Sequence, residues 1–470
     1  MDEFAVRDLR QAVASVAPDE LIQLCQELLR RPGVSGREGD VARFVAESMR
    51  SLGYDSVVID SYGNVVGEIV FSAEGPRLLL TAQMDHVDAG DAAEWSKYPF
   101  GAFIEENRIY GRAASDQKGA LAAMMLAASL LKRDRSGALK GRLFVAGAVH
   151  QETFERVASK AIGDFTDPDC VIVGEASGLL LERGQRGRAE IRVDVFGRMA
   201  HSSHPEFGVN AADVMIEFLS FLKNRFTPPR DAFLGEGILV LTNLFSSPSY
   251  NRESSQREAR PDSSAIPERC TAVFDRRLLL GETLESVVRQ FEEIVQEAVR
   301  VLPELRAKVS YPVMEDRCYT GAPIRGSHYA PAWTIPSGTP FLRELSAALE
   351  GAGLRFEVSA LPGFGTNGCY YAAERMLPTA VYGPSRRELV HTVDEYIEID
   401  ALVDSCRGYY AMAERLLTSR AAGKGASSSS QTAGRPVGRQ GKERVSAKEE
   451  KRRKVRSEEH TSELQSHSFI

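Results

Sequence analysis

Three short apolar runs in this chain each lead into an acidic residue, and this repeated pattern constrains the fold more than any other feature. The acidic residues are Asp85 after the run 77–82, Glu152 after the run 142–149 and Glu175 after the run 170–173. A short apolar run bounded by turn signals is typical of a strand that is buried on both faces. Open α/β sheets bind their ligands at the carboxyl ends of such strands, so we expect these carboxylates to lie at a binding site.

A fourth carboxylate belongs to the motif Tyr110–Gly119, directly before an Ala/Leu/Met-rich helix predicted over residues 120–131. This residue, Asp116, would be presented on a turn ahead of a buried helix, where an acidic side chain can face a metal ion. Any one of the strand-end carboxylates is more often a cap than a ligand. Three such strand ends, with Asp116 between them, favour a metal site.

Length and composition narrow the class of protein. A chain of 470 residues exceeds one ordinary domain, so two or three structural units are expected. Its 43% hydrophobic residues are typical of a soluble globular protein, and its net charge of -7 argues against nucleic-acid binding. No apolar run approaches a membrane span, residues 1–4 carry no leader-like segment, and the six scattered cysteines favour a reducing compartment. We therefore expect a cytoplasmic protein that binds neither nucleic acid nor membranes.

A change of pattern after Gly184–Gly187 predicts a second domain. Residues 188–195 alternate polar and apolar side chains, as an antiparallel strand with one buried face does. The order of strand, helix, two strands, helix and strand that starts there is that of an inserted α+β unit. We assign residues 1–187 and 313–420 to an α/β domain, residues 188–312 to the insertion and residues 421–470 to a disordered tail. Residues 456–466 match a translated sequencing adapter, so we expect the true C-terminus to lie upstream.

Longer motifs accompany the acidic residues and carry a family resemblance. They are W-x-x-x-P-F at Trp95–Phe100, Y-G-R-x-x-x-D-x-K-G at Tyr110–Gly119, H-S-x-x-P-x-x-G-x-N-A at His201–Ala211, and Gly383-Pro384 ahead of His391–Tyr396. With them, the stretch from Asp19 to about Leu417 resembles the M20 family of zinc aminoacylases, carboxypeptidases and deacylases. Residues 184–187, 274–278 and 366–368 look most similar to its branch of selenium-metabolism-linked hydrolases. The resemblance implies a phosphorylase/hydrolase-like αβα catalytic domain, interrupted by an α+β lid and dimerisation domain.

The resemblance also implies which residues bind metal. Asp116 would bridge two divalent ions, as a carboxylate does in two-metal hydrolases. Glu152 and His391 would complete the site of one ion. Glu175 would belong to the site of the other, together with the residue at position 83.

Four further residues receive roles from the same resemblance. Asp85 stands in the first catalytic motif, and His201 would reach the active site of a partner chain and polarise the scissile carbonyl, so a homodimer is expected. Arg277 and Asn367 would bind substrate, since a guanidinium binds a carboxylate through two hydrogen bonds. Two alternatives stay open: Arg277 as a surface ion pair, and His201 as a structural histidine at a strand end.

Two positions depart from the family's pattern. The first motif of the family is H-x-D, and here Gln83 stands in place of the histidine ligand. The family's Glu-Glu pair reads Gln151-Glu152, so a glutamine also stands where the general base is expected. A carboxamide is a poor zinc ligand beside imidazole and has no useful basicity to accept a proton from water. His86 and His150 do not replace the glutamines, because strand alternation puts each on the face opposite to the glutamine nearest to it.

From these features we predict a metal-dependent hydrolase of C–N bonds in peptides or N-acyl amino acids, with impaired activity and a small-molecule or short-peptide substrate. The cofactor is expected to be zinc, or another divalent ion such as cobalt or manganese. About one ion per chain should be held tightly, because a missing ligand weakens a site strongly. Two alternatives stay open: a catalytically inactive relative that acts as a dimeric binding or regulatory module, and an α/β binding protein without metal, whose acidic residues are only caps.

Overall fold

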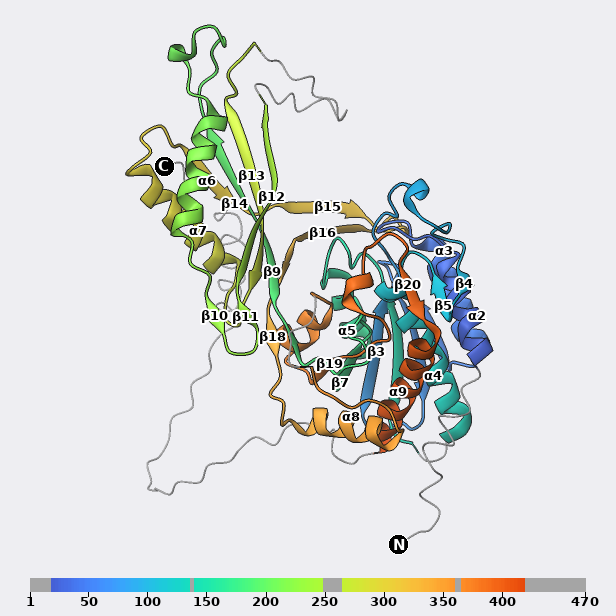
Figure 1. The fold of residues 1–470 in the computed structure, drawn as a ribbon. Coiled ribbons are helices and arrows are strands. Elements are labelled where there is room, and N and C mark those ends of the chain that lie inside the picture. The colour runs from blue at the N-terminus through green and yellow to red at the C-terminus, as the bar shows by residue number, and fades with distance from the viewer. Residues whose placement is uncertain (1–17, 136–138, 248–263, 360–364, 419–470) are drawn as a thin grey trace, which may run out of the picture.

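A computed structural model describes residues 18–135, 139–247, 264–359 and 365–418. This part of the chain forms two lobes, of which the smaller is an insertion into the larger (Figure 1). The predicted tail and its adapter-like end, residues 421–470, lie outside the described residues. No helix in the described ranges is long and apolar enough to cross a membrane.

The larger lobe is built on a six-stranded sheet in the order β1-β2-β6-β3-β7-β19. Its strands are β1 (Ser56–Ile59), β2 (Val65–Val70), β3 (Arg77–Gln83), β6 (Arg142–Ala148), β7 (Cys170–Val173) and β19 (Thr379–Val381). The last four run parallel to one another, whereas β2 is antiparallel to its neighbours β1 and β6. Strands β3, β6 and β7 are almost wholly buried, which is why their sequences are continuous apolar runs. The prediction of three buried strands is confirmed.

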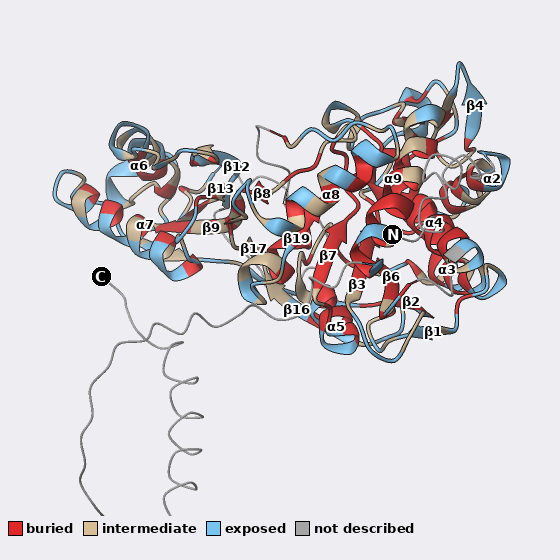
Figure 2. Ribbon diagram, turned by 90° about the horizontal axis from the view of Figure 1, so that it is seen from below, coloured by how far each residue is buried: buried red, intermediate tan, exposed pale blue. Residues whose placement is uncertain are grey.

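Helices cover both faces of this sheet. They are α2 (Pro18–Leu29), α3 (Gly39–Ser51), α4 (Gly119–Arg135), α5 (Val157–Thr166), α8 (Pro340–Gly351) and α9 (Ile399–Thr418). On β3, Leu78 and Leu80 pack into a core with α2, α3, α4, α8 and α9, while Leu79 packs into a second core that includes Ile162 of α5. Figure 2 shows the central strands, such as β3 and β7, and helix α4 among the most buried elements of this lobe. The predicted α/β fold, with helices on both faces of a sheet, is confirmed.

The smaller lobe holds a second sheet with the strand order β12-β13-β9-β14, and β17 also pairs with β9. Its elements are β9 (Gly187–Phe196), α6 (Ala211–Arg225), β12 (Ile238–Ser247), β13 (Arg269–Leu278), α7 (Leu284–Val299), β14 (Ala307–Ser310) and β17 (Tyr329–Ala330). Ile191, Phe218 and Phe291 lie in a hydrophobic core that belongs to this lobe alone. The element order is that of the α+β insertion expected from the sequence. The domain boundaries assigned there stay a prediction.

The remaining strands are short and form small sheets outside the two main ones. They are β4 (Phe103–Glu105), β5 (Arg108–Tyr110), β8 (Gly184–Gln185), β10 (Arg230–Asp231), β11 (Gly235–Glu236), β15 (Val313–Arg317), β16 (Pro323–Ser327), β18 (Trp333–Thr334) and β20 (Tyr396–Glu398). The hairpin of β15 and β16 runs between the two lobes (Figure 1). Strand β5 pairs with both β4 and β20, which brings the loop before β20 close to the turn ahead of α4.

Candidate metal centre

The ends of three parallel strands and two neighbouring loops meet at one edge of the first sheet. Gln83 ends β3, Glu152 follows β6, Glu175 follows β7, Asp116 stands on the turn before α4, and His391 lies in the loop before β20. In the described ranges, Asp116, Glu152 and His391 form a group whose ligand atoms all lie within 4.8 Å of one another. We call these three residues the imidazole half of the site.

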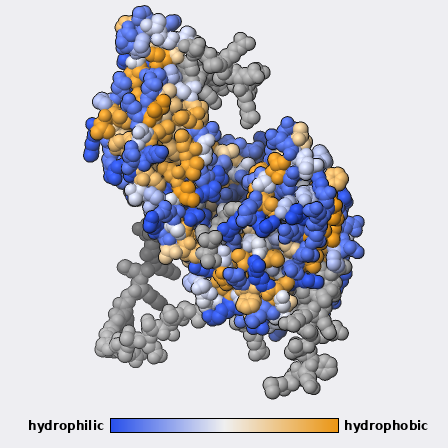
Figure 3. Space-filling model, viewed as in Figure 1, coloured by the Kyte–Doolittle hydropathy of each residue, from blue (hydrophilic) through white to orange (hydrophobic). Residues whose placement is uncertain are grey.

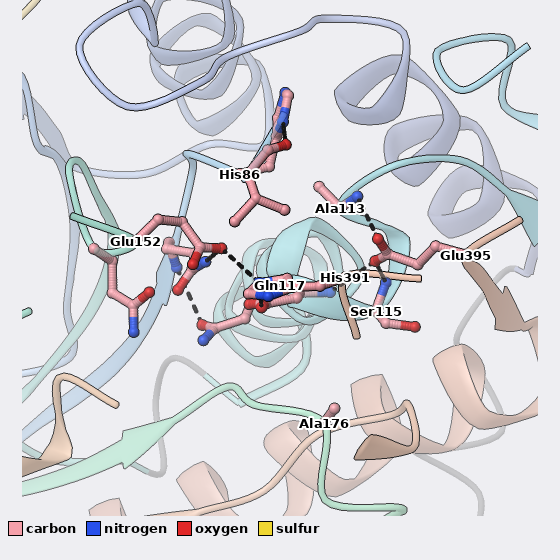
Figure 4. Close-up of polar contacts among 12 residues, drawn as sticks. His86, Ala113, Ser115, Gln117, Glu152, Ala176, His391 and Glu395 are labelled. Carbon is pink, nitrogen blue, oxygen red and sulfur yellow. Dashed lines mark hydrogen bonds and ion pairs between the residues drawn. The ribbon is translucent and has the colours of Figure 1, made fainter. Parts of the chain in front are cut away.

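The imidazole half has the charge pattern of a cation site. His391 Nε2 lies 3.1 Å from Asp116 Oδ2 and 3.3 Å from Glu152 Oε1 (Figure 4). The hydrogen bonds to Asp116 and Glu152 raise the pKa of His391 to about 10, and burial, followed by the charge of Asp116, raises the pKa of Glu152 to about 8. Asp116 Oδ1 is buried and has no hydrogen-bond partner among the described residues. A divalent cation fits this group, because it would balance both carboxylates and coordinate the unpaired oxygen.

The neighbouring residues Gln83, Gln117 and Glu175 are arranged differently, and we call them the amide half. Gln117 Nε2 donates a hydrogen bond of 2.5 Å to Glu175 Oε2, and the backbone N–H of Ala176 donates to Glu175 Oε1 at 2.9 Å. Gln83 Nε2 donates to Glu152 Oε1 at 2.9 Å. Burial, followed by the charge of Asp116, raises the pKa of Glu175 well above its usual range. Both oxygens of Glu175 thus accept amide hydrogens without any cation.

The two histidines near the strand ends lie outside both halves. His86 Nε2 accepts a hydrogen bond of 2.8 Å from the Gly33 N–H, and its Nδ1 lies 2.7 Å from the Val87 carbonyl oxygen. Figure 4 shows His86 apart from Glu152 and His391. His150 Nδ1 lies 3.0 Å from Thr153 Oγ1. Both ring nitrogens of His86 thus have contacts outside the cluster, although His86 lies three residues past the end of β3, where strand alternation no longer fixes the direction of a side chain.

Asp85 and Gln151 are both buried beside the site. The Asp85 carboxylate accepts hydrogen bonds from the backbone N–H groups of Gln151 at 3.1 Å and Glu152 at 3.0 Å, and from the Ser35 hydroxyl at 2.8 Å. Asp85 therefore holds the backbone of the loop that carries Glu152. The catalytic roles expected for positions 85 and 151 stay predictions.

Sequence reasoning missed two residues at this edge. Gln117 follows Asp116 directly, and its amide could have been noted as a donor to a nearby carboxylate. Glu395 is fully buried and accepts hydrogen bonds from the turn that carries Asp116. Its only signal in the sequence is an acidic residue inside the stretch His391–Tyr396, just before an apolar strand position.

Three residues with expected substrate roles have other contacts in this structure. His201 lies exposed on the inserted lobe, with Nδ1 2.7 Å from Ser203 Oγ. Arg277 Nε lies 2.7 Å from Asp275 Oδ1, which is the ion pair that the sequence left open as an alternative. Asn367 Oδ1 accepts a hydrogen bond of 3.0 Å from the Arg156 N–H. The substrate roles of these three residues stay predictions.

Comparison with known proteins defines the class to which this fold and site belong. The sequence profile of the peptidase family M20/M25/M40 matches residues 79–415, and the chain belongs to this family. It is therefore an M20 family hydrolase by resemblance. The matched stretch includes strands and helices of both lobes.

Individual relatives support the same class. The chain is 29% identical over 399 residues to the uncharacterized protein YgeY of Escherichia coli (strain K12), covering 83% of this chain and 93% of that protein. It is 26% identical over 331 residues to acetylornithine deacetylase of Buchnera aphidicola, covering 68% of this chain and 76% of that enzyme. Among solved structures, the YXEP protein of Bacillus subtilis, a dinuclear metal binding peptidase from the M20 family, superposes with a TM-score of 0.61 at 15% identity, over 85% of this chain and 98% of that one. The last likeness shows the shared fold.

Proposed function

We propose that this chain is a metal-dependent hydrolase of C–N bonds in peptides or N-acyl amino acids. The observation that carries the proposal is the imidazole half, in which Asp116, Glu152 and His391 converge and one buried Asp116 oxygen has no partner. A buried polar atom without a partner destabilises a fold, so such an atom in a cluster of ligands favours a bound cation. The name of the Buchnera relative, a deacetylase of an amino acid, supports an N-acyl substrate.

Zinc suits this donor set, because it binds imidazole and carboxylate ligands, and cobalt or manganese are the alternatives. When bound, the ion supplies Lewis acidity that polarises a carbonyl group and activates water. Asp116, Glu152 and His391 would hold it. Gln151 occupies the place of the general base, and an amide side chain there accepts no proton, so activity is expected to be about 10²–10⁴-fold below that of a glutamate enzyme.

We further propose that the chain holds about one ion tightly, since each absent ligand weakens a metal site strongly. The contacts of the amide half support this number. Glu175 already accepts hydrogen bonds from Gln117 and Ala176, and Gln83 Nε2 donates to Glu152. The buried Gln83 Oε1 has no partner among the described residues, but an amide oxygen is a weaker zinc ligand than imidazole. A second ion would have to displace these amide hydrogens.

A homodimer is the proposed assembly, and the open edge of the inserted sheet supports it. Strand β12 stands at the end of the strand order and exposes Val240, Leu244 and Phe245, each by nearly half of its surface. Figure 3 shows apolar surface gathered on this lobe. An exposed apolar edge strand favours pairing with another strand, most simply with a second copy about a two-fold axis. His201 would then be able to serve a neighbouring site.

Light scattering of Val240→Lys tests this assembly. A lysine on the strand edge should shift the wild-type dimer toward monomer, because its charge opposes strand pairing. Phe165→Lys, which changes an exposed apolar residue of the larger lobe, is the matched control and should leave the dimer intact. A monomeric wild type at micromolar concentration would remove His201 from the proposed catalytic residues.

Metal content and turnover test the proposed activity together. Elemental analysis after dialysis should find about one zinc equivalent per chain, and a panel of dipeptides and N-acyl amino acids should be hydrolysed slowly. Two firmly bound equivalents would show that the amide half also binds metal. Absence of any bound divalent ion would favour the metal-free binding protein.

The second candidate is a catalytically inactive relative that works as a dimeric binding or regulatory module. The two glutamines, Gln83 and Gln151, favour it. Bound metal without turnover on any substrate of the panel would select this candidate over the hydrolase.

A further inference from the structure

A buried carboxylate that belongs to neither half of the site holds the turn that carries Asp116. Glu395 is fully buried and accepts four hydrogen bonds. The donors are Arg112 Nη1 at 2.7 Å, Ser115 N at 2.8 Å, Ala113 N at 3.2 Å and Asp116 N at 3.2 Å. Figure 4 shows Glu395 reaching Ala113 and Ser115 on the side of the cluster away from Glu152. One side chain thus binds three backbone N–H groups of a single turn.

The turn needs an acceptor from elsewhere because its backbone is not helical. Asp116 has φ of -129° and ψ of 88°, although α4 begins three residues later. Buried backbone N–H groups without an acceptor are costly, and an ionised carboxylate accepts hydrogen bonds more strongly than a neutral oxygen. Arg112 is also buried and balances the charge of Glu395. The conformation of the turn therefore depends on Glu395.

Glu395 also links two members of the imidazole half. It follows His391 by four residues in the loop that leads into β20. The same loop thus supplies the imidazole of the cluster and the carboxylate that fixes the Asp116 turn. Since His391 Nε2 and Asp116 Oδ2 lie 3.1 Å apart, a movement of Glu395 would change the spacing of these two ligand atoms.

Asp85 makes equivalent contacts with the loop that carries Glu152. Its carboxylate is buried and accepts hydrogen bonds from the backbone N–H groups of Gln151 and Glu152. Glu395 and Asp85 therefore each bind the backbone of a segment that carries a proposed ligand. Outer-shell groups of this kind orient metal ligands and raise affinity.

We propose that Glu395 is a positioning residue, which presets the Asp116 turn for a divalent cation before the cation binds, and that Asp85 does the same for the Glu152 loop. The inference rests on the proposed metal-dependent function. It adds that the geometry of the imidazole half is built by two side chains outside the ligand set. The site is then preorganised, and cation binding requires little rearrangement of the backbone.

Zinc affinity measured by competition with a chromophoric chelator tests the proposal. Glu395→Gln keeps the size of the side chain but places amide hydrogens against backbone N–H donors, so affinity should fall about 10- to 100-fold. Asp85→Asn should have a similar effect. Asp194→Asn is the matched control, because Asp194 is a buried carboxylate paired with Arg192 and Arg269 in the inserted lobe. It should bind zinc as wild type does, even if its melting temperature falls equally.

Amide hydrogen exchange of metal-free wild type gives a second readout that requires no variant. The N–H groups of Ser115 and Asp116 should be protected before any zinc is added, because Glu395 already binds them. Rapid exchange of these amides in the folded metal-free protein, or unchanged zinc affinity in folded Glu395→Gln, would overturn the proposal. If wild type binds no zinc, the proposed function fails, while the exchange measurement still decides whether Glu395 presets the turn.

Discussion

The two halves of the site lie at the same sheet edge but satisfy their carboxylates in different ways. In the imidazole half, the charges of Asp116 and Glu152 face His391, and one carboxylate oxygen stays unpaired. In the amide half, Gln117 and a backbone N–H donate to both oxygens of Glu175. The first arrangement favours a cation, whereas in the second neutral donors already satisfy both oxygens of Glu175 and only the amide oxygen of Gln83 has no partner among the described residues.

The residue type at position 83 affects how the amide half could bind an ion, and the residue type at position 151 affects the supply of a base. A histidine at position 83 would offer a lone pair to a second ion, whereas Gln83 turns its amide nitrogen toward Glu152 at 2.9 Å. A glutamate at position 151 would add a base beside the imidazole half. Under the proposed function, these two glutamines leave side chains that would support about one tightly held ion.

The largest expected effect comes from making the amide half resemble the imidazole half. The double variant Gln83→His with Gln151→Glu should gain dipeptidase or deacylase activity of about 10²–10⁴-fold, because it restores a general base and a ligand. It should also bind a second metal equivalent, and Gln151→Glu alone should give a smaller gain. Steady-state kinetics and elemental analysis measure both effects.

Gln26→Glu is the control for the double variant. It introduces the same new charge at a partly buried glutamine that donates to the Ala102 carbonyl, away from the site. It should gain no activity. If wild type is already fast and the double variant gains nothing, both glutamines are irrelevant to catalysis, and the base must be sought at Glu155 or His150.

A smaller effect separates the halves by their metal affinity. Asp116→Asn removes a charge from the imidazole half and should weaken zinc binding by more than the about 10- to 100-fold typical of outer-shell changes. Glu175→Gln changes a carboxylate that amide donors already satisfy, so the loss should be less than about tenfold. Chelator competition on both variants gives the comparison. Equal losses would show that Glu175 binds the same ion as Asp116.

Much of the fold could be predicted, because the burial of a strand determines the pattern of apolar residues in its sequence. Strands β3, β6 and β7 are covered on both faces and therefore read as continuous apolar runs, and the alternation in β9 revealed the inserted lobe. The ion pair of Arg277 with Asp275 could also be predicted from the spacing, since residues two apart on a strand share a face.

The finer structure of the site could not be predicted, because it depends on contacts between distant parts of the chain. The hydrogen bond from Gln83 to Glu152 joins residues 69 positions apart, and that from Gln117 to Glu175 spans 58 positions. Their formation depends on sheet register and on side-chain rotamers, which no local pattern encodes. The contacts of Glu395 with Arg112 and Ser115 could not be predicted for the same reason, since they join residues about 280 positions apart.

The smallest expected effect concerns His86. If the two halves differ as described, His86 does not bind metal in place of Gln83. Burial, followed by the charge of Lys118, lowers the pKa of His86 to about 4, against about 6.5 in an unfolded chain. Between these values the unfolded chain takes up a proton that the folded chain does not, so the stabilisation is complete above about pH 6.5 and is lost as pH falls toward 4. Relative to His86→Gln, wild type should therefore lose about 2–3 kcal/mol of unfolding free energy over that window, measured by urea unfolding.

Zinc content of His86→Gln at pH 7.5 should equal that of wild type, because the His86 ring nitrogens contact Gly33 and Val87 and not the cluster. A variant that loses zinc, or a stability difference that does not change with pH, would place His86 in the metal site and end the comparison of the two halves.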